Sequence, residues 1–205
     1  MATRTSRSLK MLWTALRITL ILTVLLGIVY PLLITGIGQA ALRDQANGSL
    51  VHRPDGTVAG SSLIGQSFTD AEGDPLPQYF QSRPSAADYD AKASGGSNLG
   101  PESEKLTAQI DERRAQIAEF NGVAPEDVPA DALTASGSGL DPHISPDYAR
   151  LQIDRVATTR GMSADAVAAL VESATAGRDL GYLGEPRVNV VQLNLALDAA
   201  QQRSE

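Results

Sequence analysis

The chain has 205 residues, of which 42% are hydrophobic and 20% charged, so it can build one modest globular domain but not two. It contains no cysteine, which excludes disulfides, thiolate metal ligands and a cysteine nucleophile. Its formal net charge is −7, and an acidic surface repels the phosphates of nucleic acid, so we expect no nucleic-acid partner.

Residues 18–37 form a run of twenty residues without a charge. As a helix this run would be about 30 Å long, which matches the hydrocarbon core of a bilayer, so we predict a transmembrane helix over residues 18–37. We interpret Pro31 as a bend, because membrane helices tolerate proline where neighbours satisfy the freed carbonyl. A cleaved signal ending near Gly38 is the alternative, but the apolar core of a signal usually has only about 7–15 residues.

The charges on the two sides of this run predict its orientation. Residues 1–17 carry four basic residues and no acidic one, whereas all twenty-four acidic residues and thirteen of the seventeen basic ones follow residue 37. Because basic segments stay in the cytoplasm, we predict a cytoplasmic tail over residues 1–17 and a soluble extracytoplasmic domain over residues 38–205, with a net charge of −11. This acidic surface could raise the local concentration of cations, or it could serve solubility alone.

The first part of the domain, residues 51–83, has short apolar groups separated by turn residues. The apolar groups are Val58, Leu63-Ile64 and Tyr79-Phe80, and the turn residues are Asp55-Gly56, Gly60 and Pro75-Leu76-Pro77. We predict short strands joined by turns in this part.

The later part of the domain has the spacing of helices. Apolar residues share one face over about residues 102–120, and Asn121-Gly122 predicts the end of that helix. A second helix is expected to start after Ser145, with Pro146 in its first turn, and to end at Gly161. Its expected buried face consists of Ala149, Ile153, Val156 and Thr159.

A third helix is expected after Ser163, which can cap it, with Gly177 at its end. Its expected buried face consists of Val167, Leu170, Val171 and Ala174. Residues 188–202 alternate like a strand and also repeat like a helix; their length and the Asn189–Gln192 capping box favour a helix. The predicted fold is therefore a single N-terminal transmembrane helix and one mixed α+β extracytoplasmic domain, with short strands first and three to four helices later.

Two glycine-rich stretches are candidates for function, and the first is Ser94-Gly95-Gly96-Ser97-Asn98-Leu99-Gly100-Pro101. It could be a flexible linker, but a linker gains nothing from a bulky apolar residue such as Leu99. A recognition loop could dock Leu99 into a partner and present the amides around it. Docking to a partner and packing within the chain are both open at this stage.

The second stretch, residues 134–146, contains Ser136, Gly137, Ser138, Gly139, Asp141 and His143. A phosphate loop would need a Lys-Ser/Thr pair, and a serine nucleophile would need a Gly-x-Ser-x-Gly elbow; both patterns are absent from the stretch. A metal site on Asp141 and His143 has only His52 as a further imidazole. We therefore interpret Asp141-Pro142 and Ser145-Pro146 as a rigid turn before a helix, with His143 hydrogen-bonded inside it.

Several blocks, in this order, resemble the C subunit of the bacterial Kdp potassium-transporting ATPase, the KdpC family. After the anchor they are Gly60 to Gln66, Phe80 with Arg83-Pro84-Ser85, Ser94 to Pro101, Thr134 to Ser145, Gln152 with Arg155-Val156-Ala157, and Val188 to Asp198. The resemblance covers nearly the whole chain, and such a series of blocks is more specific than any single glycine motif.

The resemblance implies a non-catalytic subunit of an ATP-driven potassium uptake pump in the bacterial inner membrane. Its partners would be an ATP-hydrolysing P-type subunit, a channel-like potassium-translocating subunit and a small membrane peptide. ATP and potassium would act at the level of the complex, with no cofactor and no metal held by this chain. Members of the family are described as catalytic chaperones that raise the ATP affinity of the pump subunit.

The predicted orientation leaves only about seventeen residues on the ATP side, too few for a nucleotide pocket. The domain could instead bias a conformational state across the membrane, or its acidic surface could guard the potassium entrance. The candidate partner interface consists of Ser94, Gly95, Gly96, Ser97, Asn98, Leu99, Gly100, Ser136, Gly137, Ser138, Gly139, Asp141 and His143. The rival hypotheses are a membrane-anchored serine hydrolase that uses Ser138 and His143, and an exported ligand-binding module.

Overall fold

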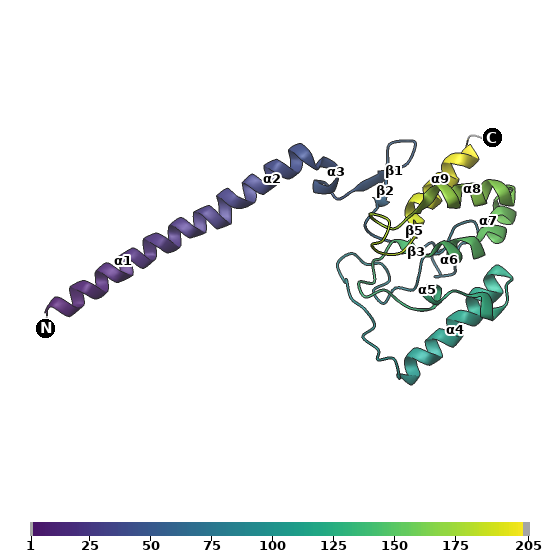
Figure 1. Cartoon of the computed structure of the whole chain (residues 1–205), viewed down its shortest axis with the longest axis horizontal. Helices are drawn as coiled ribbons and strands as arrows, with labels where there is room; N and C mark the ends of the chain where they lie inside the picture. Colours follow the sequence, from purple (N-terminus) through teal and green to yellow (C-terminus); the bar gives the residue numbers. More distant parts are fainter. Residues whose placement is uncertain (1, 203–205) are drawn as a thin grey trace. The chain divides into compact units, whose positions relative to one another are not determined.

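A computed structural model describes residues 2–202, with side chains from residue 8 onward, and Figure 1 shows its elements. The chain divides into two compact units, with the boundary between Ser49 and Leu50. The first unit is helical: α1 (Ala2–Val24), the π-helical turn η1 (Leu25–Val29), α2 (Tyr30–Ala41) and the short α3 (Arg43–Ala46).

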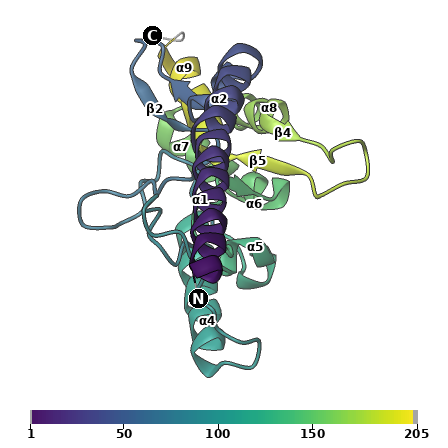
Figure 2. The ribbon, with the colours of Figure 1, turned by 90° about the vertical axis from the view of Figure 1, so that its left-hand side faces the viewer.

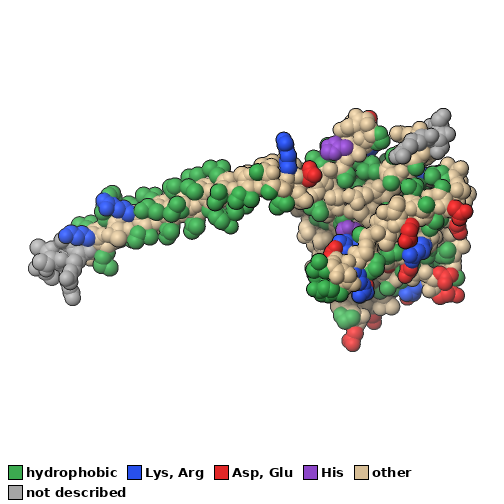
Figure 3. Space-filling view, turned by 45° about the horizontal axis from the view of Figure 1, so that its top comes forward, with side chains coloured by type: hydrophobic (Ala, Val, Ile, Leu, Met, Phe, Trp, Pro, Cys, Tyr) green, Lys and Arg blue, Asp and Glu red, His purple; other side chains and the backbone are tan. Residues whose placement is uncertain are grey.

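The helix that begins with α1 runs through η1 into α2 without interruption, and over Ser8–Ala41 it is long and apolar enough to cross a membrane. Figure 3 shows the apolar side chains that cover its surface. The structure accommodates Pro31 by widening the preceding turn, in which the Tyr30 N–H bonds to the Leu25 carbonyl five residues back. A proline has no N–H and its ring crowds the carbonyl four residues earlier, so a wider turn relieves that conflict.

The second unit contains the strands and the remaining helices. In chain order these are β1 (Leu50–His52), β2 (Val58–Ser61), α4 (Glu104–Asn121), the 3-10 turn η2 (Pro125–Asp127), α5 (Ala130–Leu133), β3 (His143–Ile144), α6 (Pro146–Leu151), α7 (Ile153–Arg160), α8 (Ala164–Ala174), β4 (Thr175–Ala176), β5 (Arg187–Asn189) and α9 (Val190–Gln202). The predicted fold class, an apolar helix followed by a small α+β region, is confirmed.

Two small antiparallel sheets organise this unit. β1 and β2 form a hairpin around Asp55-Gly56, with Leu50 opposite Ser61. The second sheet has the order β3-β5-β4, with His143 opposite Asn189 and Thr175 opposite Val188. The sequence patterns did not predict this second sheet, because its strands have only two or three residues each.

The core lies where α6 to α9 meet the sheet of β3, β4 and β5, and Phe80 belongs to the same cluster. Residues without solvent exposure come from α7, α8, α9, β5 and the segment before α4: Val156, Val167, Leu193, Leu197, Val188 and Phe80. α4 adds Ala118 to the same cluster, with Ile110 and Ile117 packed at its margin. Burying side chains of this size stabilises the unit by about 1.5–3 kcal/mol each.

The predicted helix ends are mostly confirmed. Gly122 and Gly161 adopt left-handed backbones, with φ of 67° and 64°, at the ends of α4 and α7. Ser145 and Ser163 cap α6 and α8 through their side chains. α8, however, ends at Ala174 rather than near Gly177, because the chain enters β4 there.

Four finer predictions were wrong. Strands do not form at Leu63-Ile64 or at Tyr79-Phe80. The helix predicted from Pro146 to Gly161 is divided at Gln152, whose side chain donates to the Tyr148 carbonyl in place of its own backbone N–H. Thr159 is exposed, and residues 188–189 belong to β5, so the last helix begins only at Val190.

Candidate functional site

The two glycine-rich stretches lie directly against each other, although about thirty residues of chain separate them. The Gly95 N–H donates to the Ser138 carbonyl at 2.8 Å, and Ser94 Oγ donates to the same oxygen at 3.1 Å. A Cβ on Gly96 would lie 3.2 Å from the Gly137 carbonyl oxygen. The absence of side chains therefore lets the two backbones approach, and we call residues 94–100 with 136–139 the paired loops.

Gly139 is the tightest point of the paired loops. Its φ is 67°, and a Cβ there would lie 2.7 Å from the Gly95 carbonyl oxygen and 3.0 Å from the Ala87 Cβ. Ser85 Oγ donates to the Gly139 carbonyl at 2.6 Å. A side chain at this position would have to separate the loops as well as adopt an unfavourable backbone conformation.

Gly65 likewise allows two segments of the chain to approach closely. Its N–H donates to the Leu140 carbonyl at 2.8 Å, and a Cβ would lie 2.4 Å from Tyr89 Cε1 and 2.8 Å from the Asp141 carbonyl oxygen. Burial raises the pKa of Tyr89 to about 12, so its hydroxyl stays protonated and donates to the Arg83 carbonyl at 2.6 Å. Three segments distant in sequence thus meet around Tyr89.

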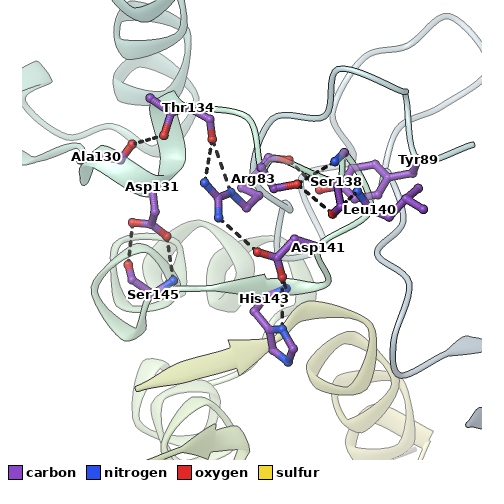
Figure 4. A network of polar contacts seen from close by, with 12 residues as sticks. Arg83, Tyr89, Ala130, Asp131, Thr134, Ser138, Leu140, Asp141, His143 and Ser145 are labelled. Atoms are coloured by element: carbon purple, nitrogen blue, oxygen red, sulfur yellow. Dashed lines mark hydrogen bonds and ion pairs between the residues drawn. The ribbon is translucent and has the colours of Figure 1, made fainter. Parts of the chain in front are cut away.

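Arg83 ties the second glycine-rich stretch to this junction (Figure 4). Its Nη1 contacts Asp141 Oδ2 at 3.1 Å, and its Nη2 donates to the Thr134 carbonyl, also at 3.1 Å. The guanidinium therefore holds both ends of the stretch from residue 134 to residue 141. A planar group with several fixed donors suits this bridging better than a lysine would.

Asp141 and His143 form the turn that the sequence indicates. Asp141 Oδ1 accepts from the His143 N–H at 3.0 Å and lies 3.2 Å from His143 Nδ1. Desolvation raises the pKa of Asp141, but the hydrogen bonds from His143 and the charges of His143 and Arg83 outweigh it and leave that pKa below its ordinary value. The carboxylate is therefore ionised at neutral pH and acts as an acceptor for its neighbours.

A second carboxylate fixes the start of α6 next to this turn (Figure 4). Asp131 accepts from the Ser145 N–H at 2.7 Å and from Ser145 Oγ at 2.8 Å. Ser145 Oγ in turn accepts from the Tyr148 N–H at 3.0 Å. One serine therefore caps the helix and joins it to α5.

The geometry does not support a serine hydrolase on Ser138 and His143. Ser138 Oγ accepts from the Leu140 N–H at 3.1 Å and lies 3.3 Å from Ser136 Oγ. Within residues 8–202, no hydrogen bond joins Ser138 to His143, whose ring faces Asp141 instead. Over the same described side chains, no group of three or more His, Asp or Glu residues gathers into a potential metal site.

The candidate interface residues differ in exposure. Exposed are Ser94, Ser97, Asn98, Gly100, Gly137 and Ser138; half-buried are Gly95, Gly96, Leu99, Ser136, Asp141 and His143; Gly139 is buried. Leu99 lines a hollow of about 280 Å³ together with Lys105, Gln109 and Arg113 of α4. Leu99 thus packs partly within the chain, while the exposed residues form a polar surface on the hydrogen-bonded backbones of the paired loops.

A second polar cluster, which we call the amide clamp, holds residues 80 and 81. Gln152 is fully buried; its Oε1 accepts from the Gln81 N–H at 2.7 Å, and its Nε2 donates to the Gln81 carbonyl at 3.2 Å. Asn194, also buried, pairs in the same way with the N–H and carbonyl of Phe80, at 2.9 and 3.0 Å. The two side-chain amides replace the neighbouring strand that this backbone does not have.

Two arginines extend the amide clamp along the same segment. Arg155 donates to the Tyr79 carbonyl at 3.0 Å and to Gln152 Oε1 at 2.8 Å, and its guanidinium lies 4.4 Å from the centre of the Phe120 ring. Burial lowers the pKa of Arg155 to about 10, which still leaves it cationic at neutral pH. Arg160 donates to the Gln78 carbonyl at 2.6 Å.

Comparison with known proteins connects these features to a family. The family described as KdpC, K+-transporting ATPase, c chain, matches residues 12–199. The chain belongs to the KdpC family. The potassium-transporting ATPase KdpC subunits of Kineococcus radiotolerans and Xanthomonas oryzae are 54% and 53% identical to it, covering 91% of this chain in each case and 92% and 88% of the relatives. The KdpC subunit of Koribacter versatilis is 48% identical over 94% of this chain and 96% of its own length.

The KdpC match includes both the apolar helix and the folded unit, so the paired loops and the amide clamp both lie within the region that defines the family. Sequence reasoning identified the paired loops but not their mutual contact. It quoted Gln152 and Arg155 without a role, and it assigned none to Asn194. A buried amide leaves no periodic signal in a sequence, because its partners lie on backbone 71 and 114 residues away.

Proposed function

We propose that this chain is a non-catalytic subunit of an ATP-driven potassium uptake pump of the bacterial inner membrane, where it assists assembly and coupling. The observation that carries the proposal is the extent of the family match, because residues 12–199 include the apolar helix as well as the folded unit. The chain spans most of the length of relatives that are named potassium-transporting ATPase KdpC subunits. Its partners would be the ATP-hydrolysing subunit, the channel-like subunit and the small membrane peptide of the same pump.

The proposed orientation places the N-terminus in the cytoplasm and the folded unit outside. The support is the charge pattern, with four basic residues and no acidic one before residue 18. The chain has no cysteine, so a single cysteine introduced at one end or the other tests this orientation directly. Labelling of an introduced C-terminal cysteine by an impermeant reagent on intact spheroplasts supports the orientation, and labelling of an N-terminal one contradicts it.

The paired loops are the proposed surface for a partner subunit. Their support is physical: the hydrogen bond from Gly95 to Ser138 and the bridge from Arg83 to Asp141 fix the loop backbones next to the exposed Ser97 and Asn98, so docking this surface costs little ordering entropy. The Ser97→Arg variant is expected to weaken retention of the partner subunits. Ala115→Arg, at an exposed position of α4, is the matched control and should leave retention unchanged.

An effect on ATP affinity would have to cross the membrane in this orientation. A coupling free energy of about 1–3 kcal/mol suffices, and it corresponds to roughly a 5- to 150-fold change in affinity. We propose this kind of coupling for the catalytic-chaperone role, rather than a nucleotide pocket in this chain. Saturable binding of ATP to the purified chain alone would contradict the proposal, whereas an ATP effect seen only in the assembled pump supports it.

The decisive experiment is to tag the full chain, extract it in mild detergent and identify co-purifying proteins by mass spectrometry. A P-type ATPase and a large channel-like subunit in fixed stoichiometry support the pump-subunit proposal. A chain that emerges alone would contradict it and favour an exported ligand-binding module. The hydrolase has no comparable geometric support, because Ser138 and His143 make their hydrogen bonds elsewhere.

A further inference from the structure

The hollow of about 280 Å³ beside Leu99 is lined by α4 and by the paired loops. Lys105, Gln109 and Arg113 of α4 line it together with Ser97 and Leu99. The three α4 residues are spaced four apart, so they lie along one face of the helix. In Figure 2 the first turn of α4 lies at the lower end of the view, where the chain enters it from the preceding loop. The hollow therefore adjoins the surface that we propose for a partner subunit.

The hollow carries positive charge, although the chain around it is acidic. Among its lining residues, all of which the structure describes, Lys105 and Arg113 are basic and none is acidic. Glu104 precedes Lys105 in the chain but does not belong to the lining. By contrast, thirteen basic and twenty-four acidic residues follow residue 37, a net charge of −11. A local excess of positive charge in such a background attracts an anionic group to this place.

The two cations of the hollow are not paired within the chain. Over the described side chains, residues 8–202, neither Lys105 nor Arg113 lies in an ion pair, whereas Arg83, for example, contacts a carboxylate. Arg113 is half-buried and donates one hydrogen bond, from Nη1 to the Leu133 carbonyl at 2.9 Å, which leaves most of its five N–H donors available. The Gln109 side-chain amide makes no hydrogen bond over the same range. The hollow thus offers two charges and an amide to a ligand from outside the chain.

We propose that this hollow holds the carboxylate of an aspartate or glutamate side chain on the extracytoplasmic surface of the channel-like subunit. The inference rests on the proposed function and orientation, which place the folded unit outside the membrane beside that subunit. Lys105 and Arg113 neutralise the carboxylate, and the Gln109 amide is a further donor to it. Hydrogen bonds from charged donors to a carboxylate are shorter and stronger than those between neutral groups.

Charge and topology select the channel-like subunit as the source of this carboxylate. A subunit that takes up potassium must open to the outside, and the entrances of cation channels carry rings of aspartate and glutamate. The ATP-hydrolysing subunit has its chemistry in the cytoplasm, on the other side of the membrane from the proposed position of the folded unit. Two copies of this chain would bring together two regions of net charge −11, which repel each other, and an anionic bilayer is repelled in the same way.

The size of the hollow fits one side chain rather than a small-molecule ligand. Sites for small molecules usually have volumes of about 300–1,000 Å³, so a hollow of about 280 Å³ lies just below that range. A nucleotide would need more room. A single acidic side chain fits, and its methylene groups can pack on Leu99 while its carboxylate reaches the two cations.

Zero-length carbodiimide crosslinking of the assembled pump, with this chain at full length, tests the contact. The reagent joins an amine to a carboxylate only where the two groups meet, so it reports the ion pair itself. The expected result is an amide bond between Lys105 and an aspartate or glutamate of the channel-like subunit, identified by mass spectrometry after digestion. Lys92, an exposed lysine outside the hollow, is the control and should give no crosslink to that subunit.

The Lys105→Met variant is an independent test. Lys105 is exposed and unpaired over residues 8–202, so its loss should leave the fold intact, whereas Arg113 also supports the Leu133 carbonyl. The variant should dissociate from the channel-like subunit about three- to tenfold faster at low salt. The difference should shrink at about 1 M salt, where the Debye length is about 3 Å. Ala115→Glu changes the net charge equally at an exposed position of α4 outside the hollow and should dissociate at the unmodified rate.

Other outcomes overturn the inference in distinguishable ways. A crosslink from Lys105 to lipid, to a second copy of this chain or to a different pump subunit identifies another occupant. Equal dissociation of the Lys105→Met and Ala115→Glu variants rejects the contact and leaves the proposed function standing. The same holds if Lys105 gives no crosslink in a complex whose other lysines react. A chain that does not co-purify with any pump subunit rejects both the contact and the proposed function.

Discussion

Replacing Gln152 with leucine tests whether the amide clamp holds the fold of the second unit. The variant keeps most of the buried volume but removes a single acceptor, Gln152 Oε1, which lies 2.7 Å from the Gln81 nitrogen and 2.8 Å from Arg155 Nη2. A buried donor without a partner costs about 1–3 kcal/mol, and the half-buried position of Gln81 moderates that cost. We expect the free energy of unfolding to fall by about 2–4 kcal/mol, a large part of the roughly 5–15 kcal/mol of a typical domain.

Urea unfolding of the full-length chain in mild detergent, followed by far-UV circular dichroism, measures this loss. With a slope of about 2 kcal/mol per molar urea, the middle of the usual range of about 1–3, the midpoint should fall by about 1–2 M. Hydrogen exchange of the peptide that contains Gln81 should accelerate in parallel, because its amide loses its protecting acceptor. Gln116→Leu makes the same chemical change at an exposed position of α4 and should stay within about 0.5 kcal/mol of the unmodified protein.

The reasoning would be refuted if Gln152→Leu and Gln116→Leu had the same midpoint and the Gln81 amide exchanged at its original rate. Such a result would mean that the helices alone hold residues 77–81 in place. A lower midpoint with unchanged exchange at Gln81 would also contradict it, because the loss would then arise elsewhere in the core.

Three further predictions concern the paired loops and their surroundings. Gly139→Ala should destabilise the unit by more than about 1 kcal/mol, because its backbone is left-handed and the opposing loop leaves no room for a Cβ. Gly137→Ala, which has open space around it, should not destabilise the unit, and thermal unfolding compares the two variants. The pKa of Asp141 is lowered in the folded protein, so the stabilisation by its carboxylate is present above about pH 4 and is lost as the pH falls through the pKa of the folded state. Asp141→Asn should cost about 1–2 kcal/mol at neutral pH and should reduce the loss of stability on acidification. Urea titrations from pH 7 to pH 3 measure both effects. Ser145→Ala should cost about 1–2 kcal/mol and more than Ser163→Ala, since Ser145 both caps its helix and donates to a carboxylate; urea midpoints of the two variants decide this.

The parts of the fold that sequence predicted depend on neighbours close in the chain. Gly122 and Gly161 end helices because their own backbones turn left-handed, and Ser145 and Ser163 cap helices whose N–H groups lie three residues ahead. These rules need only a window of a few residues. The apolar helix is local in the same sense, since its length and composition alone make it a candidate membrane span.

The missed features depend on contacts between distant segments. Phe80 resembles a strand residue in its own window, yet its N–H and carbonyl are taken by Asn194, which lies 114 residues away. Gln152 follows the helical repeat from Ala149 to Val156, yet its side chain competes with the helix for the Tyr148 carbonyl and divides it into α6 and α7. No local pattern distinguishes such an amide from an ordinary surface glutamine.

The paired loops and the amide clamp both contribute to the shape of the proposed docking surface. The paired loops have almost no apolar side chains of their own, so they cannot form by hydrophobic burial and must take their shape from close backbone contact at Gly139 and from Arg83. Arg83 can reach Asp141 only if the segment that carries it is fixed, and the amide clamp fixes that segment two residues earlier, at Gln81. Loosening the clamp should therefore disturb the paired loops, even though the Gln152 side chain lies within the core and hydrogen-bonds to Gln81, Tyr148 and Arg155. On this reasoning the buried amides set the geometry of the surface that we propose for a partner subunit, and a defect in pump assembly after substitution of Gln152 would not require Gln152 to touch the partner.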